Sequence, residues 1–517
     1  MPALVLLCAA QFMVILDITV VSVALPSIQA DLDIATKDLQ WVVTAYTLAF
    51  GGLLLLGGRA ADLFGRRRVF LMGLAVFSAA SLGAALASTA AALLVARIGQ
   101  GVGAAMLSPA ALSMITTLFA EGRERQRALA TWAAVAASGG AFGVLAGGAL
   151  TETLGWQAIF LINVPVGIAA FAVTYLKLRE SRDPHATRID WPGVATFSAS
   201  LFLLVLAMVR GNDQGWGSTM IVSLLAGSGV LLAAFVAIER RVSEPMLPLE
   251  LFKRPAFTGV QLAAFAVSGS LFALFLYLTL YLQNYLGYSP LEAGVRYLPI
   301  TIASFIAAPI AGMLLSRVPA RVMMSVGLTG GGVGLLLMAG VDAGDEWTTL
   351  LGGFLVAGAG VGLLNPVIAD VAVSVVPKER SGMAAGINDT FRQVGVAVGI
   401  AALGALFVGR GADKTGELLA GTPAGSGDRP RELVEAASSG NLDQALGAVP
   451  PGAREQVADA AGQGFIAGLN DIFMLGGIMS LAAALAALWL VRERDIEREA
   501  VEVHAPGLER EPVPEPA

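Results

Sequence analysis

Charged side chains inside long apolar stretches are the residues of this sequence whose types and positions suit chemistry. Asp17 interrupts the apolar stretch 4–26, and Arg97 lies in the stretch 91–118. A charged side chain at the centre of a membrane-spanning helix costs about 2.5–3.5 kcal/mol, so it needs a function or a partner. Because desolvation favours the neutral form of a carboxyl group, Asp17 is expected to take up and release protons.

Arg97 keeps its proton, so its side chain must face a cavity, carbonyl oxygens or an acid. Two structural alternatives stay open: Asp17 could only hydrogen-bond to a neighbouring helix, and Arg97 could extend towards the end of its own helix. A second charged pair, Asp389 and Arg392, lies in the stretch 383–408 at the i,i+3 spacing that places both on one helix face. This pair could be a second coupling site or an internal salt bridge.

The composition is that of a chain that crosses a membrane many times. Of its 517 residues, 56% are apolar and 14% are charged, and the mean hydropathy is +0.73. Average soluble domains carry roughly 25% charged residues, and a spanning helix needs about 20 mostly apolar residues. Fourteen stretches meet this requirement: 4–26, 41–58, 69–87, 91–118, 129–150, 157–177, 191–209, 219–238, 258–284, 293–315, 322–340, 348–372, 383–408 and 467–491.

Charge and cysteine content exclude several functional classes. The 33 basic and 39 acidic residues give a net charge of −6 without a global basic patch, so no nucleic acid is expected as a partner. One cysteine, Cys8, cannot form an internal disulfide, and two histidines, His185 and His504, cannot build a zinc site. The sequence has no G-x-x-x-x-G-K-[ST] motif and no catalytic constellation of His, Cys or Ser. We therefore expect no metal, no ATP-driven step and no enzyme activity.

Basic residues are distributed unevenly among the short connections between the stretches. If the N-terminus lies in the cytoplasm, the cytoplasmic connections hold nearly all of the Lys and Arg, whereas the short outer connections hold only Lys37 and Arg210. This distribution follows the positive-inside rule and predicts that both termini are cytoplasmic. The connection 409–466 is then outside the cell and is expected to carry one or two short helices.

The two halves of the chain repeat each other. The segment Gly58–Arg67 aligns with Gly312–Arg321, and Gly101–Pro109 aligns with Gly358–Pro366 at nearly the same offset. Parallel repeats of this kind are the design of transporters that rock around a site at the membrane midplane. The repeat predicts four regions: an N-terminal six-helix bundle (1–178), a linker with two inserted helices (179–257), a C-terminal six-helix bundle (258–491) that includes the outer loop 409–466, and a disordered cytoplasmic tail (492–517).

Several motifs resemble those of the major facilitator superfamily, in its fourteen-span drug:proton antiporter branch. Leu16–Pro26 is similar to the D-x-T-V-V-x-V-A-L-P pattern of that branch, and Gly58–Arg68 is similar to its G-x-L-a-D-r-x-G-r-r motif. Arg97–Gly103 resembles the motif of the fourth helix. Gly139–Leu150 resembles the antiporter motif G-x-x-x-G-P-x-x-G-G-x-L, although Val144 replaces the proline. The antiporter glycines, whose spacing also permits close helix packing, are Gly139, Gly143, Gly147 and Gly148.

The resemblance implies an all-α major facilitator fold with two six-helix bundles and two inserted helices. It also implies roles: Asp17 and Arg97 would couple proton movement to conformational change, with Asp389 and Arg392 as further coupling candidates. Asp62 would cap a helix of the other bundle that begins near Ser381, where its charge meets the positive end of the helix dipole. The expected conformational gate consists of Gly58, Asp62, Gly65, Arg66 and Arg67, in which Gly65 suits a tight turn where a Cβ would clash.

The predicted function is proton-coupled efflux of drugs, antibiotics or other small lipophilic or cationic compounds from a bacterial cell. The proton gradient supplies the energy, no cofactor is needed, and the chain is expected to work as a monomer in the inner membrane. Candidate pocket residues are Tyr46, Gln100, Trp132, Phe142, Phe272, Phe275, Tyr277 and Phe391. Two alternatives remain: an exporter of the same fold for a dedicated metabolite such as an amino acid or a siderophore, and a membrane sensor or binding protein that does not transport.

Overall fold

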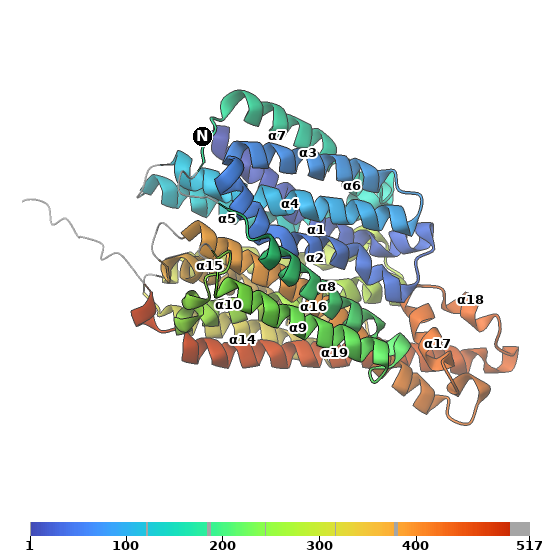
Figure 1. The fold of residues 1–517 in the computed structure, drawn as a ribbon. Coiled ribbons are helices and arrows are strands. Elements are labelled where there is room, and N and C mark those ends of the chain that lie inside the picture. The colour runs from blue at the N-terminus through green and yellow to red at the C-terminus, as the bar shows by residue number, and fades with distance from the viewer. Residues whose placement is uncertain are drawn as a thin grey trace, which may run out of the picture.

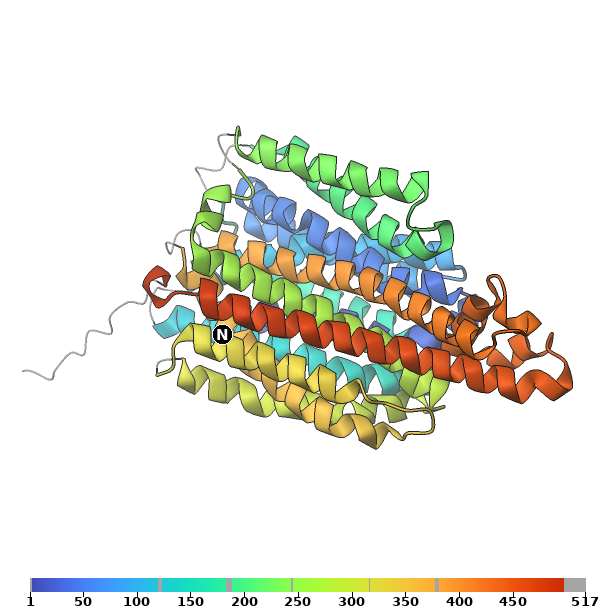
Figure 2. The same ribbon diagram turned by 90° about the horizontal axis from the view of Figure 1, so that it is seen from below.

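The computed structural model describes residues 2–119, 123–182, 188–242, 245–315, 317–376 and 381–496. Within these ranges all regular secondary structure is helical, and most helices run side by side along one direction (Figures 1 and 2). The helices α1 and α19 have their outer ends at one face of the bundle, which we call the terminal face. The short helices α17 and α18 project from the opposite face, which we call the loop face.

The N-terminal half is a bundle held together by close approaches between small residues. Helix α1 packs against α5, α2 packs against α4, and α4 also packs against α3. A Cβ added at Gly101 would lie 2.5 Å from the carbonyl oxygen of Tyr46, which explains how α4 comes so near to α2. The helices are α1 (Pro2–Leu32), α2 (Thr36–Phe64), α3 (Arg66–Ala85), α4 (Ala90–Leu118), α5 (Arg123–Leu154), α6 (Ala158–Leu161) and α7 (Asn163–Lys177).

The C-terminal half lies beside the first and repeats its helix order. Its first span is not a uniform α-helix, because π-helical turns at Ser268–Phe272 and Tyr281–Tyr285 flank α11. Helix α14 packs against α15 and against α19, and Gly360 of α15 lies directly against glycines of α14. The elements are α10 (Pro255–Val267), α11 (Ala273–Leu280), α12 (Pro290–Arg296), α13 (Leu298–Leu314), α14 (Ala320–Met338), α15 (Leu351–Ser374), α16 (Ser381–Leu418), α17 (Arg429–Ser438), α18 (Leu442–Leu446) and α19 (Arg454–Leu490).

Two inserted helices, α8 (Trp191–Gln214) and α9 (Thr219–Glu239), run along the side of the boundary between the halves (Figures 1 and 2). Helix α8 contacts α2 of the N-terminal half and α16 of the C-terminal half. Its first turn is fixed by Asp190, whose Oδ1 accepts a hydrogen bond from the backbone N–H of Gly193 at 2.9 Å. The inserted pair therefore touches both bundles at once.

In the described residues, thirteen helices are long and apolar enough to cross a membrane. A further long helix, α5, has 32 residues and occupies the remaining predicted stretch, 129–150. The predicted spans are therefore recovered as helices of an all-α, multi-pass membrane protein.

Helices α16 and α19 extend beyond their apolar stretches, so the connection between them is shorter than the predicted loop 409–466. Helix α16 continues to Leu418 and α19 begins at Arg454. The extension of α16 packs on α19: Arg410 forms an ion pair with Asp471, and the Thr415 hydroxyl donates to the carbonyl oxygen of Ala460 in the α19 extension at 3.3 Å. Hydropathy cannot detect polar helix ends that pack on each other, which explains the difference. The tail from residue 497 onward lies outside the described residues.

Candidate functional site

A buried ion pair between Asp17 of α1 and Arg97 of α4 is the centre of the candidate site. Both side chains are fully shielded, with 0% of each exposed. The Arg97 guanidinium donates to Asp17 Oδ2 through Nη1, to Gln100 Oε1 at 2.8 Å and through Nε to the carbonyl oxygen of Val42 at 2.8 Å. Arg97 therefore does not extend towards the end of its helix, and the alternative interpretation of this residue is wrong.

The second carboxylate oxygen of Asp17 is held by two amide groups. Oδ1 accepts from Gln100 Nε2 at 2.9 Å and from Asn163 Nδ2 at 3.0 Å. The same Gln100 nitrogen also lies 2.8 Å from Ser81 Oγ. These side chains come from α1, α3, α4 and α7, and all of them are buried. The ionised form of Asp17 is thus matched by one cation and by hydrogen-bond donors from two further residues.

Aromatic rings close this network against the membrane and the solvent. The guanidinium carbon of Arg97 lies 4.4 Å from the ring centroid of Tyr46 and 5.8 Å from that of Phe160. The Tyr46 hydroxyl donates to the carbonyl oxygen of Val14 at 3.3 Å. Arg97 Nη2 is buried without a hydrogen-bond partner in the described structure. The arginine therefore depends on the Asp17 charge for most of its compensation.

Ser81 and Asn163 were missed as members of the site from the sequence. Asn163 is an isolated amide side chain within the apolar stretch 157–177, and this signal could have identified it. Ser81 gives no such signal, because serine is common in spanning helices. Gln100 was expected in a substrate pocket, but the structure places it inside the Asp17 network.

The polar segment between α2 and α3 is hydrogen-bonded to the residues that follow α7. Gly65 has a φ of +105°, a conformation that favours glycine. A Cβ there would lie 2.5 Å from Glu180 Oε1. The Glu180 carboxylate accepts from the backbone N–H groups of Arg67 and Arg68 at 3.1 and 3.2 Å, so it caps the N-terminus of α3. The tight turn predicted at Gly65 is present, and Glu180 is a residue that sequence reasoning did not find.

Asp62 lies at the end of α2 and forms an i,i+4 ion pair with Arg66, with 3.4 Å between Oδ1 and Nη2. Helix α2 packs against α16, the helix whose N-terminus Asp62 was predicted to cap. That N-terminus follows residues 377–380, which lie outside the described residues, as do the side chains of Ser381 and Gly382. The cap therefore stays a prediction. Gly58 has ordinary space, since an added Cβ would stand 3.6 Å from Pro109 Cβ.

The α5 glycines bring α5 against α1 and against the other half. An added Cβ would lie 1.9 Å from Thr19 Oγ1 at Gly143 and 2.9 Å from the Val20 carbonyl oxygen at Gly147. At Gly148 it would lie 2.6 Å from the carbonyl oxygen of Pro290 in α12. Gly139 has the loosest packing of the four, with its nearest neighbours at 3.3 Å. The side chain of Val144 is outside the described residues. The motif thus serves helix contact on two sides.

A second polar group lies in α16 and its neighbours. Arg392 donates to Asn388 Oδ1 at 3.3 Å and to Asn365 Oδ1 at 3.1 Å, and Asn388 in turn donates to Gln261 Oε1 at 3.0 Å. Among the described contacts of Asp389, none is a hydrogen bond or ion pair with Arg392. The structure therefore replaces the possible internal salt bridge with an amide network around Arg392.

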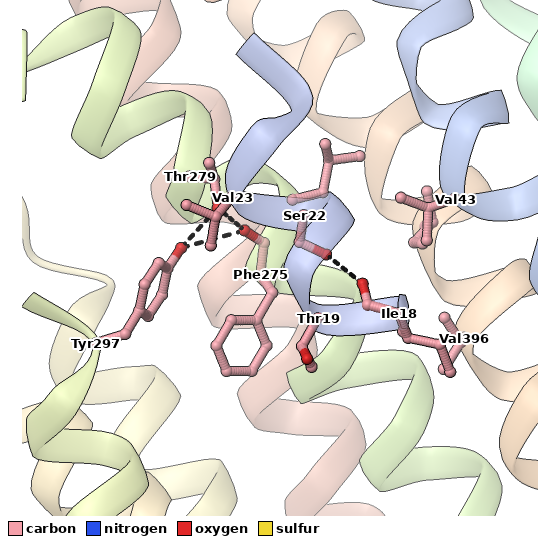
Figure 3. A pocket seen from close by; sticks show the side chains of 11 residues that line it. Ile18, Thr19, Ser22, Val23, Val43, Phe275, Thr279, Tyr297 and Val396 are labelled. Atoms are coloured by element: carbon pink, nitrogen blue, oxygen red, sulfur yellow. Dashed lines mark hydrogen bonds between the residues drawn. The ribbon is translucent and has the colours of Figure 1, made fainter. Parts of the chain in front are cut away.

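A small cavity lies between the two halves and contains about 20 Å³, room for roughly one water molecule. Four residues that carry hydroxyl groups line it from both halves: Thr19 and Ser22 of α1, Thr279 of α11, and Tyr297 beside α12 (Figure 3). The Thr279 and Tyr297 oxygens are 2.9 Å apart. The rest of the lining is apolar and consists of Ile18, Val23, Val43, Phe275, Leu276, Val396 and Ile400.

Of the aromatic residues predicted to line a pocket, Phe275 lines this cavity. Tyr277 is buried and donates to the Ile400 carbonyl oxygen at 3.2 Å, while Phe142 is 63% exposed. Tyr46 belongs to the Asp17 network, and Phe391 packs on Phe252 with ring centroids 6.0 Å apart. Trp132 is half-buried and does not line the cavity. The side chain of Phe272 is outside the described residues.

Comparison with known proteins agrees with this architecture. A cephamycin export protein of Amycolatopsis lactamdurans is 41% identical over 409 residues, covering 78% of this chain and 84% of the relative. A tetracenomycin C resistance and export protein of Streptomyces glaucescens is 32% identical over 514 residues, covering 98% of this chain and 94% of the relative. A puromycin resistance protein of Streptomyces alboniger is 41% identical over 411 residues, covering 78% and 81%.

Solved structures show the same fold. A bacterial homologue of the human lysosomal transporter Spinster, in an inward-facing and unoccupied conformation, superposes with a TM-score of 0.62 at 18% identity, covering 96% of this chain and 98% of the other. Residues 7–400 match the family model of the Major Facilitator Superfamily. The chain, with its two packed helical halves and the buried Asp17–Arg97 pair, belongs to the Major Facilitator Superfamily.

Proposed function

We propose that this protein exports antibiotic-like small molecules across a bacterial inner membrane in exchange for protons. The observation that carries the proposal is the buried Asp17 carboxylate, whose charge is balanced by Arg97 and held by Gln100 and Asn163. A buried, fully partnered acid between spanning helices is costly and is typical of a proton relay. The relatives named as cephamycin and tetracenomycin C export proteins support the export direction and the class of substrate.

Alternating access would require the contacts between the halves at the loop face to open and close. Here Glu152 of α5 accepts hydrogen bonds from the Ser289 hydroxyl at 2.7 Å and from the Leu291 N–H at 3.0 Å. Deeper in the bundle, Gln283 donates to the carbonyl oxygen of Val23 at 2.7 Å. These contacts join the two halves, so the conformation described is closed at the loop face. The opposite state of the cycle would separate them.

Protonation of Asp17 would act on this equilibrium through Arg97. The neutral acid no longer balances the guanidinium, and Arg97 has carbonyl and amide acceptors but no other carboxylate within its network. Asp17 and Arg97 belong to α1 and α4, so a change in their attraction alters the packing of two helices of the N-terminal half. A proton that binds in only one conformation then shifts the equilibrium between the two conformations by the difference between its binding free energies for them.

The cavity between the halves is the proposed substrate position, and it would have to enlarge around a drug-sized molecule. Its apolar lining and its hydroxyl groups suit lipophilic compounds that carry a few polar groups. We place the terminal face, where α1 begins and α19 ends, in the cytoplasm, because the basic connections lie on that side. Export would then run from the terminal face towards the loop face.

Transport by purified protein in liposomes tests the proposal. When a gradient is imposed that drives protons into the compartment facing the terminal side, puromycin or tetracenomycin C should move out of that compartment. The proton gradient should collapse as substrate is added. A membrane potential imposed at equal pH on both sides of the membrane would serve as the control for electrically driven transport. Transport that continues unchanged after a protonophore abolishes the gradient would contradict proton coupling. No movement of either antibiotic would contradict the proposed substrate class.

A further inference from the structure

Two buried carboxylates, Asp190 and Glu239, meet where the inserted helices reach the terminal face. Asp190 caps the start of α8 and is 7% exposed, while Glu239 is the last residue of α9 and is 4% exposed. One oxygen of each acid has a donor: Asp190 Oδ1 accepts from Gly193 N at 2.9 Å, and Glu239 Oε2 accepts from Leu247 N at 3.1 Å.

The other oxygen of each acid has no donor. Asp190 Oδ2 and Glu239 Oε1 are both buried, and neither has a hydrogen-bond partner in the part of the chain that the structure describes. Both oxygens lie beside Gly193, since a Cβ added there would stand 2.3 Å from Asp190 Oδ2 and 3.2 Å from Glu239 Oε1. The two unpartnered oxygens are therefore neighbours that face the same point.

Among the described residues, no basic side chain bonds to either acid, and the nearby guanidinium of Arg59 on α2 donates instead to the Arg188 carbonyl oxygen at 2.9 Å. Asp190 is the charged group that acts on Glu239, and the other groups that do so are the backbone N–H groups of Leu247 and Met246. The basic side chains nearest in sequence, those of Arg188, Arg240 and Arg241, are all exposed to solvent. The tilted rings of Phe197 and Phe235, with centroids 5.1 Å apart, lie one helical turn beyond Gly193 and one turn before Glu239. Two ionised carboxylates in such a place would repel each other without compensation.

From this geometry we infer that Asp190 and Glu239 share one proton, forming a proton-binding site separate from Asp17. The O–H of one acid donates to the free oxygen of the other, which supplies the donor that both oxygens lack. The bond ties the beginning of α8 to the end of α9.

Because α8 contacts both halves, a change at this site would affect the packing of the whole transporter. The Ser198 hydroxyl of α8 donates to the Gly52 carbonyl oxygen of α2 at 2.9 Å. Further along α8, Asn212 donates to the Ala405 carbonyl oxygen of α16. Loss of the shared proton would leave two negative charges at one buried point and separate the helix ends. The pH at the terminal face would thereby determine how α8 packs against both halves.

Infrared spectroscopy and distance measurement on the purified full-length protein test the inference. Between about pH 5 and about pH 9, the wild-type protein should lose the C=O band of a protonated carboxyl group that Glu239→Gln and Asp190→Asn both lack. Gln and Asn keep a permanent donor at the pair, so both variants should fold. Glu250→Gln, which changes an exposed acid on the same connection, should retain the wild-type band.

Spin labels at Trp191 and Ala237, two exposed positions at these helix ends, provide the second readout. The distance between them should increase with pH in the wild-type background and stay constant in Glu239→Gln and in Asp190→Asn. A wild-type distance that does not change with pH would overturn the inference. A Glu239→Gln protein with the full wild-type band change would overturn it as well, and both results are independent of whether Asp17 couples transport to protons.

Discussion

Asn163 donates a hydrogen bond to Asp17 across 146 positions of the chain, with 3.0 Å between Nδ2 and Oδ1. This bond joins α7 to α1 and completes the set of donors around the ionised carboxylate. Because Gln100 shares the same oxygen, the Asp17 charge is held from two helices: α4, which carries Arg97 and Gln100, and α7, which carries Asn163.

Replacing Asn163 with Ala should move the pH dependence of transport. The substitution removes a hydrogen bond to a charged group, worth about 1.5–3 kcal/mol, from the ionised form only. The pH at which transport is half-maximal should therefore rise by about one to two units. Transport rates of proteoliposomes measured across pH would show the shift, with Asn441→Ala, an exposed amide between α17 and α18, as a control. A profile that coincides with that of the wild type would remove Asn163 from the coupling network.

Glu152→Gln should weaken the closure between the halves at the loop face. The carboxylate accepts from Ser289 and from the N–H of Leu291, and the neutral amide accepts more weakly and loses one charge-assisted bond. Spin labels at Leu154 and Val295, two exposed positions on either side of this contact, should show a larger population at long distance. Glu346→Gln, an exposed acid in another connection, is the matched control. Identical distance distributions in both variants would argue against a role for Glu152 in closure.

Gly143→Ala should destabilise the N-terminal half, since the new Cβ would stand 1.9 Å from Thr19 Oγ1 and 3.2 Å from the Leu16 carbonyl oxygen. Overpacking of this kind costs about 1–3 kcal/mol. Gly386→Ala in α16 is the control, because nothing lies within 4 Å of its added Cβ. Thermal unfolding in detergent should give a lower midpoint for Gly143→Ala alone. Equal midpoints for the two variants would show that α1 and α5 can separate without cost.

Tyr297→Phe should change which substrates are transported well while leaving proton coupling intact. Its hydroxyl lies at the cavity and 2.9 Å from Thr279 Oγ1, so substrates that hydrogen-bond there would lose about 0.5–1.5 kcal/mol. The KM for such a substrate should rise by about two- to tenfold, whereas the KM for a purely apolar one should not. Competition assays with the two kinds of compound would measure this difference. A uniform change for both kinds would indicate a structural effect instead.

The sequence predicted the fold well because hydropathy and small-residue spacing act locally. The apolar stretches became helices, and Gly65 adopts the turn conformation that its motif indicates. The pairing of Asp17 with Arg97 was also within reach, since each buried charge requires a partner. Ser81 and Glu180 were not, because their roles depend on which helices become neighbours. The cavity was predicted poorly for the same reason: Tyr46 and Tyr277 are aromatic, as pocket residues often are, yet their rings pack inside the bundle.

In the proposed cycle Asp17 carries the transported proton, and Asp17→Asn tests this role most directly. Asn keeps the shape and a hydrogen-bonding group beside Arg97 but cannot titrate. In proteoliposomes, the variant should still exchange labelled substrate for unlabelled substrate at equal pH, yet fail to accumulate substrate when a proton gradient is imposed. Asp389→Asn, measured in parallel, should retain accumulation. If Asp17→Asn concentrates substrate against its gradient as the wild type does, another group carries the transported proton and Asp17 is not the coupling acid.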